Sequence, residues 1–268
     1  MLSAHDVWFG YDARSPVLRG VSVDIASRAL VGILGPNGSG KTTLLRLLAG
    51  TRSPQRGVVT LDGAPVAAQS RAALARRIAV VPQETQLAFD YSVAEVAMMG
   101  RYPHLGAFEI EGPLDAAAVH AALAATGTGH LADRQFTMLS GGEKQRVVIA
   151  AALAQISDSV EDTGTRVLLL DEPTASLDLT YQLEVLSVLQ RLNAEHGLSI
   201  VISTHDLNLA ASLCRTLLLI RDGRVVAAGA SEAVLTQDSI RALYGVDAEI
   251  VDRPSGGRAI LPVRRTGS

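Results

Sequence analysis

The stretch "LVGILGPNGSGKTTLLRLL", residues 30–48, joins a continuous apolar run to a glycine-rich turn and a leucine-rich segment. The run at residues 30–34 shows no polar alternation, which is typical of a parallel strand covered on both faces. Glycine permits backbone conformations that other residues avoid, and the leucines that follow recur at helical spacing. The stretch therefore predicts a strand, a tight turn and a helix in direct succession.

The turn itself, Gly35–Thr42, matches a pattern of glycine, four residues, glycine, lysine, then serine or threonine. Such a turn aims backbone N–H groups at one point, and the helix start adds positive potential. We expect Lys41 to reach the β- and γ-phosphates of a nucleotide and the Thr42 hydroxyl to bind Mg²⁺. The candidate nucleotide-binding residues here are Gly35, Pro36, Asn37, Gly38, Ser39, Gly40, Lys41, Thr42 and Thr43.

Three further apolar runs, at residues 78–81, 167–170 and 199–203, have the same continuous character and are separated by helical patterns. Alternating strands and helices predict an α/β fold with a parallel sheet and right-handed crossovers. The segments at 21–25 and 57–63 alternate more, which indicates antiparallel strands in an N-terminal β subdomain.

Residues from about 90 to 150 carry almost only helical patterns, so we predict a helical insert subdomain within the α/β core. After residue 230 we expect two short helices and two strands that flank "RPSGG". The predicted division is a nucleotide-binding domain over residues 1–240, which includes the insert, and a C-terminal tail over 241–268.

The run at 167–170 leads into "DEPTASLD", so Asp171 and Glu172 lie at the carboxyl end of a buried strand, where α/β sheets place ligands. One carboxylate can hold Mg²⁺, which we assign to Asp171, and the adjacent Glu172 can polarise a water. Alone, an acidic pair after a strand is an ordinary solvated turn. Together with the lysine-containing turn, it completes a metal–phosphate site.

Composition excludes several classes of protein. The 268 residues carry a net charge of −3, which argues against a protein that binds nucleic acid by neutralising phosphates. A single cysteine, Cys214, excludes an internal disulfide and fits a reducing compartment. The first ten residues show no secretory signal, and no apolar run approaches the roughly 20 residues of a membrane span.

Four motifs occur together in one order: "VVPQ" at 80–83, "LSGGEKQR" at 139–146, "DEPTASLD" at 171–178 and "STHD" at 203–206. This set resembles the ATP-binding subunit of ABC transporters over nearly the whole chain, which implies a P-loop NTPase fold. In that family two subunits pair head to tail. The resemblance implies that Ser140, Gly141 and Gly142 bind the γ-phosphate of ATP held by the other copy, because a helix N-terminus is an anion site.

The same resemblance implies roles for single residues. Glu172 is the general base, and His205 contacts the γ-phosphate. Gln83 senses Mg²⁺ and the attacking water, and Asp178 lies in the loop that communicates across the dimer. Tyr11 stacks on adenine, although Phe9 or Trp8 could do so instead. The predicted catalytic residues are Glu172, His205, Lys41 and Gln83, and the predicted metal ligands are Thr42, Gln83 and Asp171.

Three segments resemble the metal-chelate importers of this family, which transport iron–siderophore, cobalamin or haem. They are "FDYSVAEVAMMGRYPHLG" at 89–106, "DLNLAA" at 206–211 and "LYGVDAEIV" at 243–251. The resemblance implies a membrane permease partner, an extracytoplasmic binding protein and a peripheral position on the cytoplasmic face of the membrane. An exporter ATPase and a soluble ABC protein remain the alternatives. The acidic segment 156–166 resembles haem-type members, and a solvated loop is its simplest interpretation.

Overall fold

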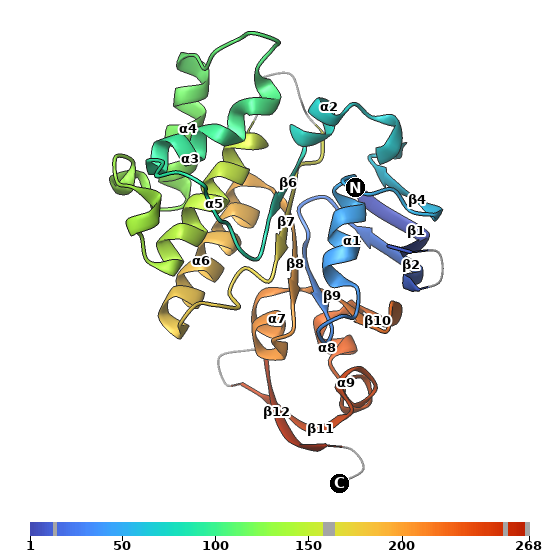
Figure 1. The fold of residues 1–268 in the computed structure, drawn as a ribbon. Helices are drawn as coiled ribbons and strands as arrows, with labels where there is room; N and C mark the ends of the chain where they lie inside the picture. Colours follow the sequence, from blue (N-terminus) through green and yellow to red (C-terminus); the bar gives the residue numbers. More distant parts are fainter. Residues whose placement is uncertain (13–14, 158–163, 254–256, 266–268) are drawn as a thin grey trace.

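The computed structural model describes residues 1–12, 15–157, 164–253 and 257–265, where three sheets form. Helices α3 to α6 lie on one side of the central sheet, and the N-terminal sheet and α1 lie on the other (Figure 1). Most of the predicted acidic loop, residues 158–163, lies outside the described residues.

The central sheet has six strands in the order β10-β9-β3-β8-β7-β6. All neighbours are parallel except β9 and β10, which are antiparallel. The four strands predicted from continuous apolar runs are confirmed as β3, β6, β7 and β8, whereas β9 and β10 were not predicted. The bounds are β3 (Leu30–Leu34), β6 (Ile78–Val81), β7 (Val167–Asp171), β8 (Ser199–Thr204), β9 (Thr216–Arg221) and β10 (Arg224–Ala230).

Strand β7 shows why these runs have no polar alternation. Val167 and Leu169 join the hydrophobic cluster toward α1 and the N-terminal sheet, and Leu168 and Leu170 join the cluster toward the helical insert. All four side chains are fully buried. Both faces of the strand are covered, so both faces must be apolar.

The N-terminal sheet has the order β2-β1-β4-β5 and is antiparallel throughout, which confirms the predicted β subdomain. The two predicted strands are β2 and β4, and β1 lies between them. This sheet and α1 bury one shared apolar cluster against the central sheet. The bounds are β1 (Leu2–Gly10), β2 (Pro16–Ile25), β4 (Arg56–Leu61), β5 (Ala64–Pro65), α1 (Lys41–Leu48), η1 (Val66–Ala68) and α2 (Arg71–Ala75).

The helical insert is confirmed between residues 90 and 150, and its helices pack against α6 and one face of the central sheet (Figure 1). Two of its helices begin with a capping box, formed by Ser92 with Glu95 and by Ser140 with Glu143. Among the described residues, none of the helices combines the length and the hydropathy of a membrane span. The bounds are α3 (Val93–Met98), η2 (Met99–His104), α4 (Pro113–Ala125), η3 (Gly129–Leu131), η4 (Phe136–Met138), α5 (Gly141–Gln155) and α6 (Leu179–His196).

The C-terminal segment forms two short helices and a two-stranded hairpin, as predicted, and lies beside α7 (Figure 1). Helix α9 continues across residue 240, so the division at that residue stays a prediction. Gly245 ends α9 in a left-handed conformation with a φ of 66°. The bounds are α7 (Leu207–Leu213), α8 (Ser231–Val234), α9 (Gln237–Tyr244), β11 (Val246–Asp252) and β12 (Arg258–Arg265).

Candidate active site

The predicted phosphate-binding turn connects β3 to α1. Gly40 has a φ of 106° and precedes the first residue of α1, and a Cβ there would lie 2.6 Å from Leu18 Cδ2. A Cβ at Gly35 would lie 2.2 Å from the carbonyl oxygen of Ile220. Backbone conformation and close packing thus both require glycine, and the turn brings its amides to the start of α1.

Lys41 is the first residue of α1, and its side chain is only 5% exposed. Its Nζ donates to the carbonyl oxygens of Gly35 at 2.9 Å and Pro36 at 3.2 Å. The same Nζ lies 3.3 Å from Oε1 of Glu172. A buried ammonium with this set of partners is a compact positive charge at the base of the turn, suited to an anionic ligand.

Glu172 directly follows β7 and has a φ of 45°, an uncommon conformation for a residue with a side chain. Its N–H donates to both the carbonyl oxygen and the hydroxyl of Ser203, each at 3.1 Å. The Ser203 hydroxyl also donates to Asp171 Oδ1 at 2.6 Å. Ser203 therefore holds the two adjacent carboxylates in different orientations, and sequence reasoning had not assigned it a role, although it opens the "STHD" motif.

His205 follows β8, the strand next to β7. Its Nδ1 lies 3.0 Å from Glu172 Oε2, and 52% of its side chain is exposed. The Glu172 carboxylate thus lies between a lysine on one oxygen and a histidine on the other. The structure brings together three of the four predicted catalytic residues at the carboxyl ends of β3, β7 and β8.

A cavity of about 460 Å³ adjoins Lys41 and Glu172, whereas His205 and Asp171 are not among its lining residues. Gln83, the fourth predicted catalytic residue, lines this cavity together with Thr42 and Glu172. Val17 also lines the cavity and was not predicted, because nothing in its sequence context distinguishes it from other β-sheet residues. The lining residues are Val17, Asn37, Gly38, Gly40, Lys41, Thr42, Thr43, Gln83 and Glu172.

The donors at this cavity fit a magnesium nucleotide. Thr42 and Gln83 supply oxygen atoms, and Mg²⁺ in nucleotide sites takes few protein ligands because phosphate oxygens and waters complete its shell. Accordingly, the described residues contain no group of three or more His, Cys, Asp or Glu that could hold a metal alone. The buried Ser39 hydroxyl has no hydrogen-bond partner among the described residues, which suits a turn that binds an oxyanion.

Among the three aromatic residues considered for adenine stacking, Tyr11 is the exposed one, at 55%. Phe9 is buried at 8% exposure and packs edge-on against the Tyr11 ring. The Trp8 indole N–H donates a hydrogen bond to Asp6 Oδ1 at 3.0 Å. The Tyr11 hydroxyl lies 3.4 Å from Thr43 Oγ1 and accepts from Arg46, so Tyr11 is fixed beside the phosphate-binding turn.

Ser140, Gly141 and Gly142 do not line this cavity. They begin α5, where Ser140 Oγ lies 2.8 Å from Glu143 Oε2 and accepts from the Glu143 N–H. The Ser140 N–H and hydroxyl lower the pKa of Glu143. Packing within the same chain explains the glycine at position 142, because a Cβ there would lie 2.4 Å from Tyr181 Cδ1. Gly141, by contrast, is exposed. Nearby, Asp178 caps α6 by accepting from the Tyr181 N–H at 3.1 Å.

The "GRYPH" stretch, residues 100–104, makes contacts that connect the helices of the insert. A Cβ at Gly100 would lie 2.1 Å from the carbonyl oxygen of Ala151 in α5. Arg101 is buried, pairs with Asp115 of α4 at 2.9 Å and donates to the carbonyl oxygen of Ala154 at 2.7 Å. His104 Nε2 lies 2.8 Å from the carbonyl oxygen of Gln155. These residues bind η2 to α4 and α5.

The sequence matches the family described as ABC transporter over residues 18–175, more than half of the chain. The hemin import ATP-binding protein HmuV of Bordetella pertussis is 43% identical over 255 residues, which cover 93% of this chain and 95% of that protein. The cobalamin import ATP-binding protein BtuD of Halobacterium salinarum is 44% identical over 91% of this chain, which spans only 59% of that protein.

Solved structures agree with this result. An inward-facing structure of a metal-chelate type ABC transporter superposes with a TM-score of 0.83 at 29% identity, covering 98% of this chain and 96% of that one. A bacterial ABC transporter cassette solved as a dimer gives a TM-score of 0.72 at 27% identity, covering 86% of this chain and 99% of that one. The chain belongs to the ABC transporter family, in which it is an ATP-binding subunit that hydrolyses ATP.

Proposed function

We propose that two copies of this chain hydrolyse ATP to power the import of a metal chelate through a membrane permease. The position of Glu172 supports the hydrolytic reaction. Its carboxylate lies 3.3 Å from Lys41 Nζ and 3.0 Å from His205 Nδ1, beside a cavity lined by Thr42 and Gln83. These contacts fix the carboxylate at the edge of the cavity, where it can act as the general base in phosphoryl transfer once a triphosphate has taken Lys41 as its partner.

In the proposed reaction, the amides of Gly35–Thr42 and the Lys41 ammonium bind the triphosphate, and Tyr11 stacks on adenine. Glu172 accepts a proton from water as the water oxygen bonds to the γ-phosphorus and the bond to ADP breaks. His205 donates to the γ-phosphate. Thr42, Gln83 and Asp171 would hold Mg²⁺, which would neutralise charge on the phosphate oxygens.

The head-to-tail homodimer belongs to the same proposal. The N-terminus of α5, a helix of 15 residues, can bind an anion through its dipole and through the N–H groups of Gly141 and Gly142, which have no acceptor within the helix. It lies outside the cavity of its own chain, so a second copy is the natural source of the phosphate. Met138, Leu179 and Leu183, beside α5 and on α6, are 70%, 71% and 59% exposed, as an interface requires.

Two findings support the import of a metal chelate. The relatives that cover most of this chain include hemin and cobalamin import proteins, and the structural neighbour with a TM-score of 0.83 is of the metal-chelate type. We place the chain on the cytoplasmic face, with residues 1–240 as the ATPase domain and 241–268 as the tail. Phe108, Ile110 and Leu114 of the insert are strongly exposed, which suits contact with a permease. An extracytoplasmic binding protein would deliver the chelate.

The test is reconstitution in proteoliposomes with a permease of the metal-chelate type from the same organism, followed by uptake of haem, cobalamin and an iron–siderophore. The proposal expects ATP-dependent uptake of one of the three, which requires a binding protein on the opposite side. A Glu172→Gln chain, assembled equally well, should give no uptake. Transport in the opposite direction without a binding protein would identify an exporter and contradict the proposal.

A further inference from the structure

The C-terminal segment contacts the backbone of His205 directly. Tyr244, the last residue of α9, donates its hydroxyl to the carbonyl oxygen of His205 at 3.1 Å. The two residues are 39 positions apart in the sequence, so the contact exists only because the C-terminal segment folds back beside α7. The hydroxyl is the one polar group by which this side chain can act on the active site.

The environment keeps this hydroxyl a donor. Tyr244 is half-buried, and its burial raises the pKa of the phenol, as do the negative charges of Asp206 and Glu172. A phenol with a raised pKa stays protonated through the neutral and mildly alkaline range. The phenol therefore remains able to donate to the His205 carbonyl oxygen through this pH range.

A second contact holds the same segment from β12. The Asn208 side chain donates to the carbonyl oxygen of Ile260 at 3.0 Å and accepts from the Ile260 N–H at 2.8 Å. Between the two contacts, Asp206 caps α7 by accepting from the N–H groups of Asn208 and Leu209. Residues 205–208 are thus attached to the C-terminal segment at both ends.

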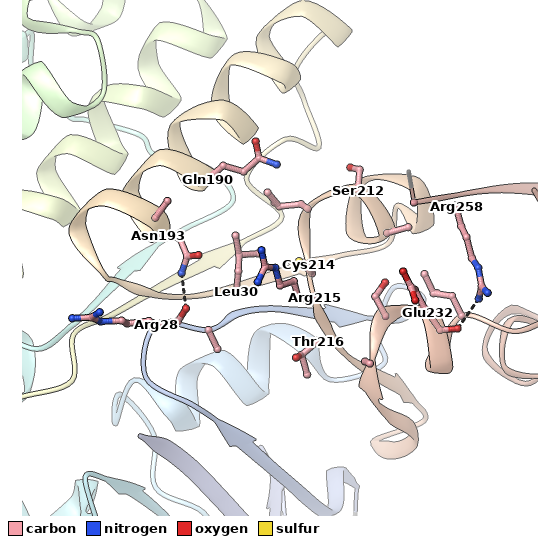
Figure 2. Close-up of a pocket in the computed structure, with 18 residues that line it drawn as sticks. Arg28, Leu30, Gln190, Asn193, Ser212, Cys214, Arg215, Thr216, Glu232 and Arg258 are labelled. Carbon is pink, nitrogen blue, oxygen red and sulfur yellow. Dashed lines mark hydrogen bonds between the residues drawn. The ribbon is translucent and has the colours of Figure 1, made fainter. Parts of the chain in front are cut away.

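The far end of α7 borders open space. A groove-like cavity of about 1050 Å³ lies between α6, the last residues of α7 and α8, with Ser212 and Cys214 on its wall (Figure 2). Across it, Arg258 of β12 donates to the carbonyl oxygen of Glu232 at 2.6 Å. Leu213 and Cys214 are nevertheless buried in the core, so both this packing and the hydrogen bonds at its start hold α7 in place.

We propose that Tyr244 is a positioning residue for ATP hydrolysis: its hydroxyl holds the His205 peptide so that the imidazole stays at Glu172. The inference rests on the proposed role of His205. It makes the C-terminal segment part of the catalytic apparatus, because a displacement of α9 would be transmitted to His205 through one hydrogen bond.

The test is Tyr244→Phe, which removes the hydroxyl and keeps the ring. Loss of one neutral hydrogen bond predicts a kcat for ATP lowered about fivefold, with KM within about twofold. Tyr102→Phe is the matched control, since Tyr102 is 59% exposed on the insert and should retain the kcat of the unaltered chain. Asn208→Ala, which breaks the contact with Ile260, should lower kcat in the same direction.

A double-mutant cycle separates positioning from general destabilisation. In a His205→Ala background, measured in single-turnover assays, Tyr244→Phe should have no further effect. An unchanged kcat in Tyr244→Phe, or the same fold-loss in both backgrounds, would overturn the inference. If His205→Ala itself kept the full kcat, the proposed role of His205 would fail, and the positioning role with it.

Amide hydrogen exchange supplies a readout that does not depend on activity. Tyr244→Phe should speed exchange in residues 205–213 and leave α1 and α5 unchanged, whereas Tyr102→Phe should alter neither. Unchanged exchange at residues 205–213 would contradict the proposal that the Tyr244 hydroxyl holds this segment in place, even if kcat fell.

Discussion

The Lys41 ammonium and the Glu172 carboxylate lie 3.3 Å apart, both largely buried, at the point where the phosphate-binding turn meets the end of β7. Each neutralises the other in the chain without nucleotide. A triphosphate bound at the turn would take Lys41 as its partner and leave Glu172 to act on water. In the proposed function, the same pair contributes stability without nucleotide and takes part in catalysis once nucleotide is bound.

Replacing Lys41 by alanine removes this charge. Charge-assisted hydrogen bonds contribute about 1.5–3 kcal/mol, so Lys41→Ala should weaken ATP binding by about 10- to 100-fold. Isothermal titration with ATP and Mg²⁺ measures the change. Arg71→Ala, on the exposed surface of α2, is the control for a lost cation, and nucleotide affinity that is equal in all three chains would contradict the assigned site.

Ser203→Ala tests how the two adjacent carboxylates are oriented. The variant loses the 2.6 Å bond to Asp171 and one acceptor for the Glu172 N–H, while the backbone contact remains. We expect kcat to fall about tenfold, which corresponds to about 1.4 kcal/mol. Ser187→Ala, on the exposed face of α6, should keep its activity. A fully active Ser203→Ala would show that Ser203 does not position the carboxylates.

Gly141→Asp separates the fold of α5 from the proposed binding of phosphate in the partner's site. A carboxylate in the first turn of a helix is stabilising, so the free energy of unfolding should hold or rise slightly. The same charge would repel a γ-phosphate, so ATP should no longer drive dimerisation, as measured by light scattering. Gly142→Ala should instead lower stability by about 1–3 kcal/mol, because its Cβ would meet Tyr181. An unaltered ATP-dependent dimer in Gly141→Asp would count against the composite site.

Arg101→Met tests the internal support of the helical insert. Arg101 and Asp115 form a buried pair, and removal of one partner of such a pair costs about 3 kcal/mol. Arg56→Met is the control, because Arg56 is 73% exposed and its pair with Asp6 should contribute at most about 1 kcal/mol. Chemical denaturation of both variants gives the comparison, and equal losses would refute a special role for Arg101.

The pH dependence of this pair has a definite sign. The Gly112 N–H and the Arg101 guanidinium lower the pKa of Asp115 in the folded chain. Its stabilising contribution is therefore complete above the unfolded pKa, near 4, and is lost as pH falls through the folded pKa. The difference in unfolding free energy between the unaltered chain and Asp115→Asn should shrink below about pH 4. A constant difference would contradict the assignment.

Much of the fold could be predicted because its signals are local. Strands buried on both faces are continuous apolar runs, and Ser140 and Asp178 mark helix starts by their capping chemistry. Strand β9 has the same apolar character as β3 and was overlooked. Strand β1 is harder to find, since register shifts after Ala4 and Val7 break its alternation.

The site residues that belong to sequence motifs could be predicted, whereas a residue that reaches the site from a distant segment could not. Lys41, Gln83, Glu172 and His205 were all predicted, and the structure brings them together. Tyr244 was not predicted, because its contact with His205 depends on how α9 folds back and no local pattern encodes that.

The Glu172→Gln chain with ATP and Mg²⁺ tests the central claim most directly, because glutamine keeps the shape of the side chain and cannot accept the proton. Light scattering together with analysis of the bound nucleotide should show a stable dimer that retains intact ATP. Release of ADP and phosphate at the rate of the unaltered chain, or a monomer at saturating ATP, would contradict the account.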